Sequence, residues 1–392
     1  MKKILISGAS IGGPALAYWL VRYGFEVTVV ELAPGLRGGG QAIDVRGPAL
    51  DVADRMGVLP ALRANATGMR GMTMVDLDGN EVFSSTERTI TGGDLDSPDV
   101  EILRDDLARV IIEAAGDGVE YLFGDSIAAL DQDARGVRVT FASGGTGEFD
   151  LVVGADGLHS NTRRLAFGPE ADFLKNLGTY LAVFTTPNFL ELDRWQVFCQ
   201  VPGGRWGGGV MSVRGNTEAR AYLGFQSDAP VVFDHRDLDE QKRVLARAYE
   251  GVGWEFPRLL ELMHDAPDFH FDAMAQIHMD TWSNGRVALL GDAGYCGSPL
   301  SGQGTSMAMV GAYVLAGELK AAAGDHVAAF AAYERELRDY VAANQQLALD
   351  NKKRVEAAHA EDLGDSGAGE ALVDEGVPDF AEVVGSFDVR DY

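Results

Sequence analysis

The sequence predicts an α/β fold in which a Rossmann-like unit is interrupted by an inserted β-sheet segment and followed by a long C-terminal helix. The chain opens with a strand–helix–strand pattern over residues 3–31. Alternating, aromatic-rich stretches occupy about residues 178–226, as is typical of strands with one buried face. An amphipathic pattern with the helical period extends over about residues 327–357, which indicates one long helix.

The composition limits the classes of function. The 392 residues are 46% hydrophobic and 23% charged, which suits one large folded unit or two closely packed domains and argues against disorder. The net charge of −26 makes binding to nucleic acid or to an anionic membrane surface unfavourable. The only cysteines are Cys199 and Cys296, so we expect no disulfide framework and a reducing, cytoplasmic location. The 49 glycines, about twice the average frequency, indicate close backbone approaches around a ligand.

The first elements form a βαβ unit. We expect a buried strand at Lys3–Ser7, a glycine turn, a helix at Ile11–Tyr23 and a second strand at Glu26–Glu31. Pro14 suits the first helical turn, where its missing N–H has no partner. The uncharged run over residues 4–21 is interrupted by three glycines, a proline and two serines. We therefore expect neither a signal peptide nor a membrane-spanning helix.

Local patterns predict the remaining elements in order. Apolar spacing near the helical period predicts helices at Ala49–Met56, Arg104–Ala115, Leu238–Tyr249, Thr305–Ala321 and Val327–Ala357. Turn signals predict a hairpin at Val75–Val82, a strand pair Val137–Phe141 and Phe149–Val153, and a strand at Arg286–Leu290. Residues 36–46 read as a glycine-rich connection, and residues 361–392 as an acidic surface tail.

The first motif is Gly8-Ala-Ser10-Ile-Gly12-Gly13, which ends the first strand and opens the first helix. Glycines there permit a tight turn, and the backbone N–H groups and positive helix end face a pyrophosphate. Ser10 stands in place of the usual middle glycine. Glu31, eighteen positions after Gly13, can accept hydrogen bonds from ribose hydroxyls. The motif predicts a dinucleotide site, with a purely structural turn as the alternative.

The second motif runs from Asp150 through Gly-Ala-Asp156-Gly to Ser160 and Arg163. It predicts a buried strand, a turn and a helix that begins near Ser160. Taken alone, it is best interpreted as a structural strand–turn–helix in which Ser160 caps the helix.

The third motif is the strand Gly285–Gly291 followed by Asp292, Pro299, Gly302 and Gly304 and then a helix. A carboxylate at a strand end can hold a polyol hydroxyl. The helix N-terminus at the same edge would stabilise negative charge on a reduced flavin ring. A capped helix alone would not explain why three glycines and a proline crowd this turn.

The three motifs together, in this order, resemble those of the class A flavoprotein aromatic hydroxylases, the family of para-hydroxybenzoate hydroxylase and the tetracycline-inactivating monooxygenases. The resemblance covers residues 1 to about 320, and the long C-terminal helix is similar to that of the tetracycline-inactivating branch. It implies an FAD-binding domain from residues 1–75, 100–175 and 275–325, and a substrate-binding domain from 76–99 and 176–274. Residues 326–360 would be the C-terminal helix and 361–392 the acidic tail.

The resemblance also implies cofactor-binding residues. The FAD pyrophosphate would lie on Gly8, Ser10, Gly12 and Gly13, the adenosine ribose on Glu31, and the phosphate and ribityl region near Arg104. Asp44 would contact FAD, and Arg37, seven positions earlier, would meet NADPH. Asp156 would serve both FAD and NAD(P)H, with Arg163 supporting its loop. The ribityl chain and flavin ring would lie on Asp292, Pro299, Gly302 and Gly304.

The implied reaction is monooxygenation of an aromatic or polyketide-like small molecule. NAD(P)H would reduce FAD, O₂ would add to form a flavin hydroperoxide, and its distal oxygen would pass to the substrate. This chemistry requires no metal and no protein nucleophile, so we name no catalytic residue. His235 and His270 are candidate bases for a phenol, although a lone histidine is more often structural. Arg37 favours NADPH over NADH, and Cys296 is interpreted as an inert packing residue.

The substrate itself is not predicted. Val183 falls where the tetracycline-inactivating enzymes carry a substrate-binding glutamine, which puts tetracycline in doubt. The candidate pocket residues are Phe198, Gln200, Met211, Arg214, Tyr222 and Phe225. Alternation alone does not say which of them face inward, and the aromatic ones fit a plain core equally well.

Other functions remain open at this stage. The same fold would serve epoxidation, Baeyer–Villiger insertion or a non-oxygenating FAD-dependent reductase. An NAD(P) dehydrogenase would use the first motif alone and leave the other two unexplained, and a scaffold that merely retains FAD is a further alternative. No Trp-x-Trp-x-Ile-Pro stretch of the flavin halogenases is present. We expect a monomer, since the sequence shows no further C-terminal domain of the kind common in larger phenol hydroxylases.

Overall fold

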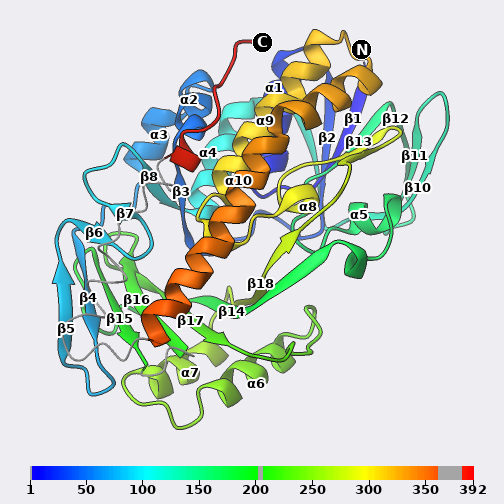
Figure 1. Ribbon diagram of the computed structural model, residues 1–392. Coiled ribbons are helices and arrows are strands. Elements are labelled where there is room, and N and C mark those ends of the chain that lie inside the picture. The colour runs from blue at the N-terminus through cyan, green and yellow to red at the C-terminus, as the bar shows by residue number, and fades with distance from the viewer. Residues whose placement is uncertain (1, 202–205, 361–381) are drawn as a thin grey trace.

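The computed structural model describes residues 2–201, 206–360 and 382–392. Two sheets dominate it: one carries helices at the end of the molecule where both termini lie, and the other is backed by two helices at the opposite end (Figure 1). The predicted α/β class, with an inserted sheet and a long C-terminal helix, is confirmed.

The six-stranded sheet forms the Rossmann-like part. Its strand order is β19–β20–β13–β1–β2–β9, and all neighbours are parallel except β19 and β20. The strands are β1 (Lys3–Ser7), β2 (Glu26–Glu31), β9 (Val119–Phe123), β13 (Leu151–Gly154), β19 (Ser283–Asn284) and β20 (Val287–Leu289). The helices α1 (Gly12–Arg22), α4 (Arg104–Ala115) and α9 (Gly304–Ala321) pack together beside it.

Shorter elements surround this sheet. The helical ones are α2 (Pro48–Arg55), α3 (Leu59–Ala64), η1 (Gly116–Gly118), α5 (Asn161–Ala166), η2 (Glu170–Asp172), α8 (Asp292–Tyr295) and η3 (Pro299–Ser301). Two antiparallel pairs are β3 (Ala42–Val45) with β8 (Val100–Leu103) and β6 (Arg88–Thr89) with β7 (Gly93–Asp94). A third small sheet contains β10 (Ile127–Gln132), β11 (Val137–Phe141) and β12 (Thr146–Phe149).

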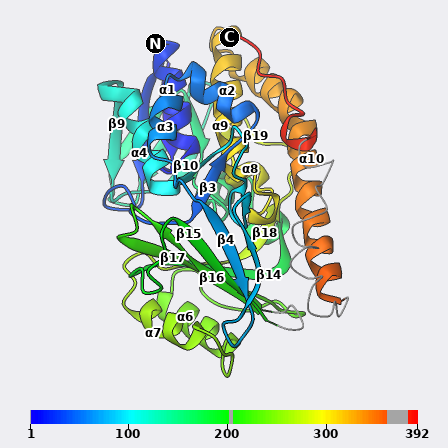
Figure 2. The same ribbon diagram turned by 90° about the vertical axis from the view of Figure 1, so that its left-hand side faces the viewer.

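The seven-stranded sheet has the order β18–β14–β17–β16–β15–β4–β5. Its strands are β4 (Gly71–Val75), β5 (Glu81–Ser85), β14 (Leu174–Thr186), β15 (Trp195–Gln200), β16 (Trp206–Val213), β17 (Glu218–Gln226) and β18 (His270–Ile277). The helices α6 (Leu238–Ala248) and α7 (Phe256–His264) lie beneath it (Figure 2). Alternate residues therefore face either these helices or the six-stranded sheet.

Helix α10 (His326–Ala360) runs along both sheets (Figure 2). Tyr333 donates from its hydroxyl to the carbonyl of Leu289 in β20, at 3.1 Å. The amide of Gln345 donates to the carbonyl of Ile277 in β18, at 2.8 Å. The helix therefore ties the two sheets together. Among the described residues, no helix is both long and apolar enough to cross a membrane.

Three expectations need correction. The segment Phe149–Val153 is not one strand, because Phe149 ends β12 while β13 begins at Leu151 in a different sheet. The connection at residues 36–46 contains strand β3. Strand β4, which we grouped with the FAD-binding segments, belongs to the seven-stranded sheet through its parallel pairing with β15. Local patterns do not show which sheet a short strand joins.

The last residues are also more ordered than a surface tail. Residues 361–381 of the predicted tail lie outside the described residues. Residues 382–392, which we call the C-terminal strap, pack on α2, α9 and α10. The ring of Tyr392 lies against Gly317 and its hydroxyl donates to Glu318 at 2.9 Å. Phe387 packs on Tyr340 with ring centroids 5.4 Å apart.

Candidate active site

The first motif forms a compressed turn at the carboxyl end of β1. Gly8 has φ +109°, and a Cβ there would lie 2.4 Å from the carbonyl oxygen of Ala155. A Cβ on Gly13 would lie 1.9 Å from the carbonyl oxygen of Gly8. Both positions therefore admit only glycine, because the obstructing atoms belong to the backbone. The turn brings the N-terminus of α1 to the edge where the β13 turn also ends.

A pocket beside this turn collects four of the predicted cofactor residues. It is lined by Ala9, Ser10, Glu31, Gly35, Leu36, Arg37, Arg104, Asp105 and Ala108. Glu31 accepts hydrogen bonds from the backbone N–H groups of Ala9 at 2.8 Å and Ala33 at 2.9 Å. Arg104 donates to the hydroxyl of Ser10 at 3.4 Å, and burial lowers its pKa from the ordinary value. A carboxylate beside two guanidinium groups suits a ribose next to a phosphate.

The second motif holds itself together through Asp156. Its carboxylate accepts from Ser7 and Ser160, and from the N–H and hydroxyl of Thr162 at 2.9 and 2.8 Å. These contacts join the end of β1 to the start of α5, where Ser160 is the N-cap. This geometry agrees with the structural interpretation of the motif, because all four donors come from the protein itself.

Arg163 links the second motif to the third. It is fully buried and donates to the carbonyl oxygens of Ala293 at 2.9 Å and Leu158 at 2.7 Å. It also donates to Glu170 at 2.9 Å. The three glycine-rich turns therefore meet at one edge of the six-stranded sheet, which is where parallel α/β sheets bind ligands.

The third motif places a carboxyl group next to the start of α9. Asp292 is exposed although Gly291 and residues 293–298 are buried. Burial nevertheless raises the pKa of Asp292, so protein encloses the carboxyl closely while solvent still reaches it. Gly304 opens α9, and a Cβ there would lie 3.9 Å from an oxygen of Asp292. The motif therefore offers a carboxyl group beside a helix N-terminus, the pairing expected for a polyol chain and a flavin ring.

Asp44 lies apart from the pocket at Ser10. It is buried, and Arg46 donates to its Oδ2 at 2.9 Å. Its Oδ1 has no hydrogen-bond partner among the described residues. Burial raises the pKa of Asp44 to about 7, although Arg46 opposes the shift. A buried acceptor without a partner is unusual, and it fits a ligand atom at this position.

A network centred on His159, which sequence reasoning missed, joins the turn after β13 to β18. His159 lies between Asp272 at 2.9 Å and Glu170 at 2.9 Å, and its ring stacks on His235 at 4.4 Å. Burial lowers the pKa of His159, but hydrogen bonds to both carboxylates outweigh it and raise the pKa to about 9. The histidine stood inside the second motif, yet its partner Asp272 lies 113 positions away. No local pattern signals that contact.

His270 occupies the same face of β18. It pairs with Val183 across to β14 and is exposed. Asp268, two residues before it, contacts Gly40, and Asp272, two residues after it, contacts His159. His270 therefore lies where the two parts of the molecule meet. Although solvent reaches the ring, desolvation by the surrounding protein and the positive charges of Arg37 and Arg104 lower the pKa of His270.

The predicted pocket residues divide between the two faces of the seven-stranded sheet. Phe198, Met211 and Tyr222 pack with Val183 and with Leu103, on the face turned toward the six-stranded sheet. Phe225 was predicted for the pocket but lies on the other face, stacked on Tyr180 at 5.1 Å. Alternation along the strand accounts for the difference, since 222 and 225 differ by an odd number.

Two further pocket candidates also need comment. Arg214 was predicted to contact substrate, but its guanidinium is bound by Asp105 at 2.6 Å, Asp106 at 3.1 Å and Glu218 at 2.9 Å. The three carboxylates leave it no obvious role as a substrate ligand. Gln200 ends β15, and its side chain lies outside the described residues.

The two cysteines are separate and buried. Burial raises the pKa of the Cys296 thiol well above its usual value. The thiol donates to the carbonyl of Ala275 at 3.5 Å. A thiol without access or thiolate character is unreactive, which agrees with its interpretation as a packing residue.

Comparison with known proteins extends this picture. Residues 1–348 match the model of a family described as FAD binding domain. The chain is 57% identical over 351 residues to an uncharacterized protein of Mycobacterium tuberculosis, covering 90% of this chain and 94% of that protein. It is 45% identical over 348 residues to a flavin-dependent monooxygenase of an unknown prokaryotic organism, covering 88% of each.

Among solved structures, the tetracycline destructase Tet(51) is similar over 100% of both chains, with a TM-score of 0.88 and 37% identity. The chain therefore belongs to the family of FAD-dependent monooxygenases. It is an oxidoreductase with FAD as cofactor, and the resemblance to class A flavoprotein hydroxylases is confirmed.

Proposed function

We propose that this protein uses NAD(P)H and O₂ to insert one oxygen atom into an aromatic or polyketide-like small molecule. The observation that carries the proposal is the pair of separate polar positions at one edge of the six-stranded sheet. One contains Ser10, Glu31 and Arg104, and the other contains Asp292 beside Gly304. An extended dinucleotide needs two such separated positions. The histidine-containing face of β18 is joined to this edge by the contact of Asp272 with His159.

The residues we propose for FAD divide by the part of the cofactor. The pyrophosphate lies on Gly8, Ser10, Gly12 and Gly13, the adenosine ribose on Glu31, and the phosphates and ribityl region near Arg104. The flavin end is held by Asp44, Asp292, Pro299, Gly302 and Gly304, and Asp156 shapes the turn beside it. Arg37 is exposed and takes the phosphate-bearing reductant, which favours NADPH.

When bound and reduced, FAD would provide the chemistry that activates O₂, and the oxygen atom transferred to the substrate would come from that O₂. The chain's own task is to orient the substrate and to exclude water. The face built from Val183, Phe198, Met211 and Tyr222 suits an apolar, aromatic surface. His270 offers an imidazole without a hydrogen-bond partner among the described residues, and it can accept a proton from an acidic hydroxyl.

A tetracycline is one compound to test, because a tetracycline destructase is among the similar structures. The side chain of Val183 cannot form a hydrogen bond. By resemblance, the tetracycline-inactivating enzymes carry a glutamine at this position. We therefore propose a polycyclic phenol or enol that is held mainly by apolar contact, with one acidic oxygen toward His270.

The test begins with the visible spectrum of the purified protein, recorded before anaerobic NADPH, after it, and again in air. We expect a yellow protein that NADPH bleaches and air restores, with faster bleaching in the presence of a suitable polycyclic phenol. Mass spectrometry after reaction under ¹⁸O₂ should show one labelled oxygen atom in the product. Bleaching and O₂ uptake without a labelled product would instead indicate a non-oxygenating flavoprotein.

A further inference from the structure

The glycine loop at Gly39 and Gly40 is held through every one of its backbone polar groups. The N–H of Gly39 donates to Asp105 at 2.8 Å, and Arg104 donates to its carbonyl at 3.1 Å. The N–H of Gly40 donates to Asp268 at 3.4 Å, and Arg220 donates to its carbonyl at 3.0 Å. Four side chains therefore determine the path of two residues.

Neither position tolerates a side chain. Gly39 and Gly40 have φ of +75° and +96°, in the left-handed region. A Cβ on Gly39 would lie 1.8 Å from the carboxylate of Asp268, and one on Gly40 would lie 2.4 Å from the guanidinium of Arg104. The loop is thus held by contacts to its backbone at both glycines.

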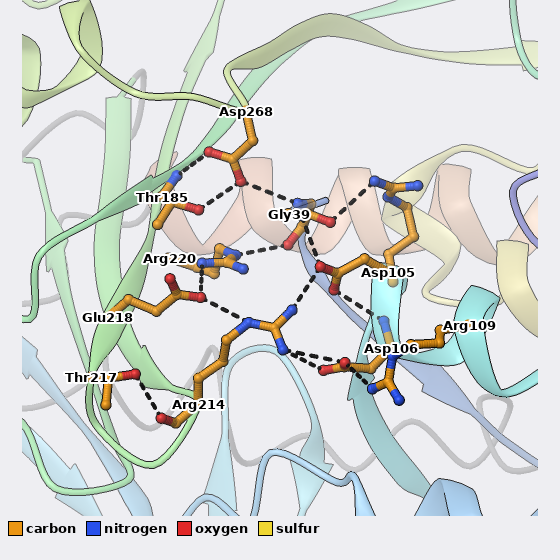
Figure 3. Close-up of polar contacts among 12 residues, drawn as sticks. Gly39, Asp105, Asp106, Arg109, Thr185, Arg214, Thr217, Glu218, Arg220 and Asp268 are labelled. Carbon is orange, nitrogen blue, oxygen red and sulfur yellow. Dashed lines mark hydrogen bonds and ion pairs between the residues drawn. The ribbon is translucent and has the colours of Figure 1, made fainter. Parts of the chain in front are cut away.

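Two of the side chains that hold the loop, Asp105 and Arg220, are linked through Arg214 and Glu218 (Figure 3). Arg214 bridges Asp105 at 2.6 Å to Glu218 at 2.9 Å, and Glu218 in turn accepts from Arg220 at 3.0 Å. Asp268 accepts from the N–H and hydroxyl of Thr185 in β14, at 2.8 and 2.6 Å. The members come from α4 on one side and from the seven-stranded sheet and its loops on the other.

The cluster is partly shielded from solvent, since the side chains of Arg214 and Glu218 are 35% and 29% exposed but two other members are more deeply buried. The side chain of Arg220 is 1% exposed and that of Asp105 is 14% exposed. Ion pairs at such positions lose less to screening than exposed pairs do. Each carboxylate also has charged or polar partners within hydrogen-bond distance, so the cluster resists rearrangement.

We propose that this cluster, the loop clamp (Arg104, Asp105, Arg214, Glu218, Arg220 and Asp268), is a positioning device. It holds the glycine loop between α4 and the substrate-facing sheet, and so places Arg37 for the nicotinamide reductant. Arg37 lies two residues before Gly39, and Arg104 also donates to its carbonyl at 3.4 Å. The inference rests on the proposed role of Arg37 in binding NADPH. It makes Arg214 and Arg220 positioning residues that need not touch a ligand.

The experiment compares three clamp variants in the FAD-loaded protein. Asp268→Asn and Arg220→Gln weaken the hydrogen bonds to the backbone of Gly40, and Arg214→Gln removes the ion pairs that link Asp105 to Glu218. Arg109→Gln is the matched control, because Arg109 pairs with Asp106 at 2.6 Å and makes no contact with the loop. Arg37→Ala tests the reductant site itself.

Three readouts separate positioning from general stability. Hydrogen–deuterium exchange of the peptide over residues 36–43 reports the loop, and FAD titration with thermal melting reports the fold. Anaerobic stopped-flow reduction gives the apparent Kd for NADPH. For the clamp variants we expect about tenfold faster exchange at the loop and an apparent Kd for NADPH raised about tenfold, as losing a charged hydrogen bond implies. FAD affinity should stay within about threefold, and Arg109→Gln should match the wild type.

The outcomes distinguish the two proposals. A raised Kd in Arg37→Ala but not in the clamp variants overturns the clamp and leaves the reductant site standing. An unchanged Kd in Arg37→Ala overturns the reductant site and the clamp with it. If Arg220→Gln does not fold, Asp268→Asn and the partly exposed Arg214→Gln still decide the matter. Equal effects in Arg109→Gln would show that the cluster acts only on stability.

Discussion

At the scale of single residues, several carboxyl and imidazole groups lie in surroundings that change their protonation. Asp44, Asp292 and His159 have shifted pKa values for different reasons: burial for the first two, and paired carboxylates against burial for the third. Groups of this kind gather at functional sites, and here they lie at or near the edge where the three turns meet.

Asp44 gives a prediction about pH. Burial raises its pKa from an ordinary 3.8 to about 7 in the folded protein. Folding therefore favours the protonated carboxyl of Asp44. The stability that this group contributes is fully present below about pH 4 and is lost as the pH rises through about 7. Asp44→Asn removes this titration. Between pH 5 and pH 8, we expect the free energy of unfolding of the wild type to fall by about 1–3 kcal/mol more than that of Asp44→Asn.

The measurement is urea unfolding at both pH values, with and without saturating FAD. An identical change with pH in the two proteins would contradict the prediction. Asp388→Asn is a suitable control, because Asp388 is exposed.

His270 gives a prediction about catalysis. Burial and the charges of Arg37 and Arg104 lower its pKa, so the imidazole is neutral and able to accept a proton at neutral pH. His270→Gln should reduce kcat/KM for a phenolic substrate by about a hundredfold, the lower end for a general base. FAD affinity, measured by fluorescence titration, should not change. Turnover within about threefold of the wild type would assign His270 a packing role instead.

At the scale of elements, the strand–turn–helix units determine where the cofactor lies. The β1 turn and the β13 turn touch because Gly8 has no side chain. Close packing of this kind depends on backbone atoms that have no room to move. The glycines in these turns are therefore required by contact as well as by dihedral angle.

Gly13→Ala tests this requirement. The new methyl group would lie 1.9 Å from the carbonyl oxygen of Gly8, so α1 must move away from β1. We expect a loss of about 2–4 kcal/mol in stability, in the range for overpacking and strain, together with loss of bound FAD. Gly145→Ala is the control, since its nearest contact would be 3.7 Å. Thermal melting and flavin absorbance check both variants, and FAD retained by Gly13→Ala would contradict the prediction.

The same elements show what the sequence could predict. Strands Lys3–Ser7, Glu26–Glu31 and Val137–Phe141 and helix Arg104–Ala115 agree with the structure, because their periodicity and flanking turns are local signals. The stacking of Phe225 on Tyr180 and the ion pairs of Arg214 could not be predicted, because the face of a strand and the partners of a charge depend on distant segments. The contact of His159 with Asp272 was not predicted for the same reason.

At the scale of the whole molecule, helix α10 and the C-terminal strap hold the parts together. The strap is anchored by Arg55, which donates to the carbonyl of Val389 at 2.8 Å, and by Arg390, which pairs with Glu336 at 3.4 Å. Tyr313 donates to the carbonyl of Arg390 at 2.8 Å. These contacts close the surface over α2, α9 and α10.

Tyr392→Ala measures the strap's contribution. It removes a ring from Gly317 and a hydrogen bond to the buried Glu318. We expect a loss of about 2 kcal/mol in the free energy of unfolding, and a single transition in which circular dichroism and flavin fluorescence coincide. Asp388→Asn again serves as the control. Separate transitions for the two signals would mean that the sheets unfold independently.

The loop clamp has a consequence for how this sequence can vary. Gly39 and Gly40 present only backbone groups, whereas the side chains that hold them come from three distant segments. A substitution at Asp105 removes one carboxylate partner of Arg214. A second substitution, far away in the chain, must then compensate for the lost ion pair. Relatives that lose one member of the cluster should therefore have replaced the others as well, so that the residues at 105, 214 and 218 vary as a set.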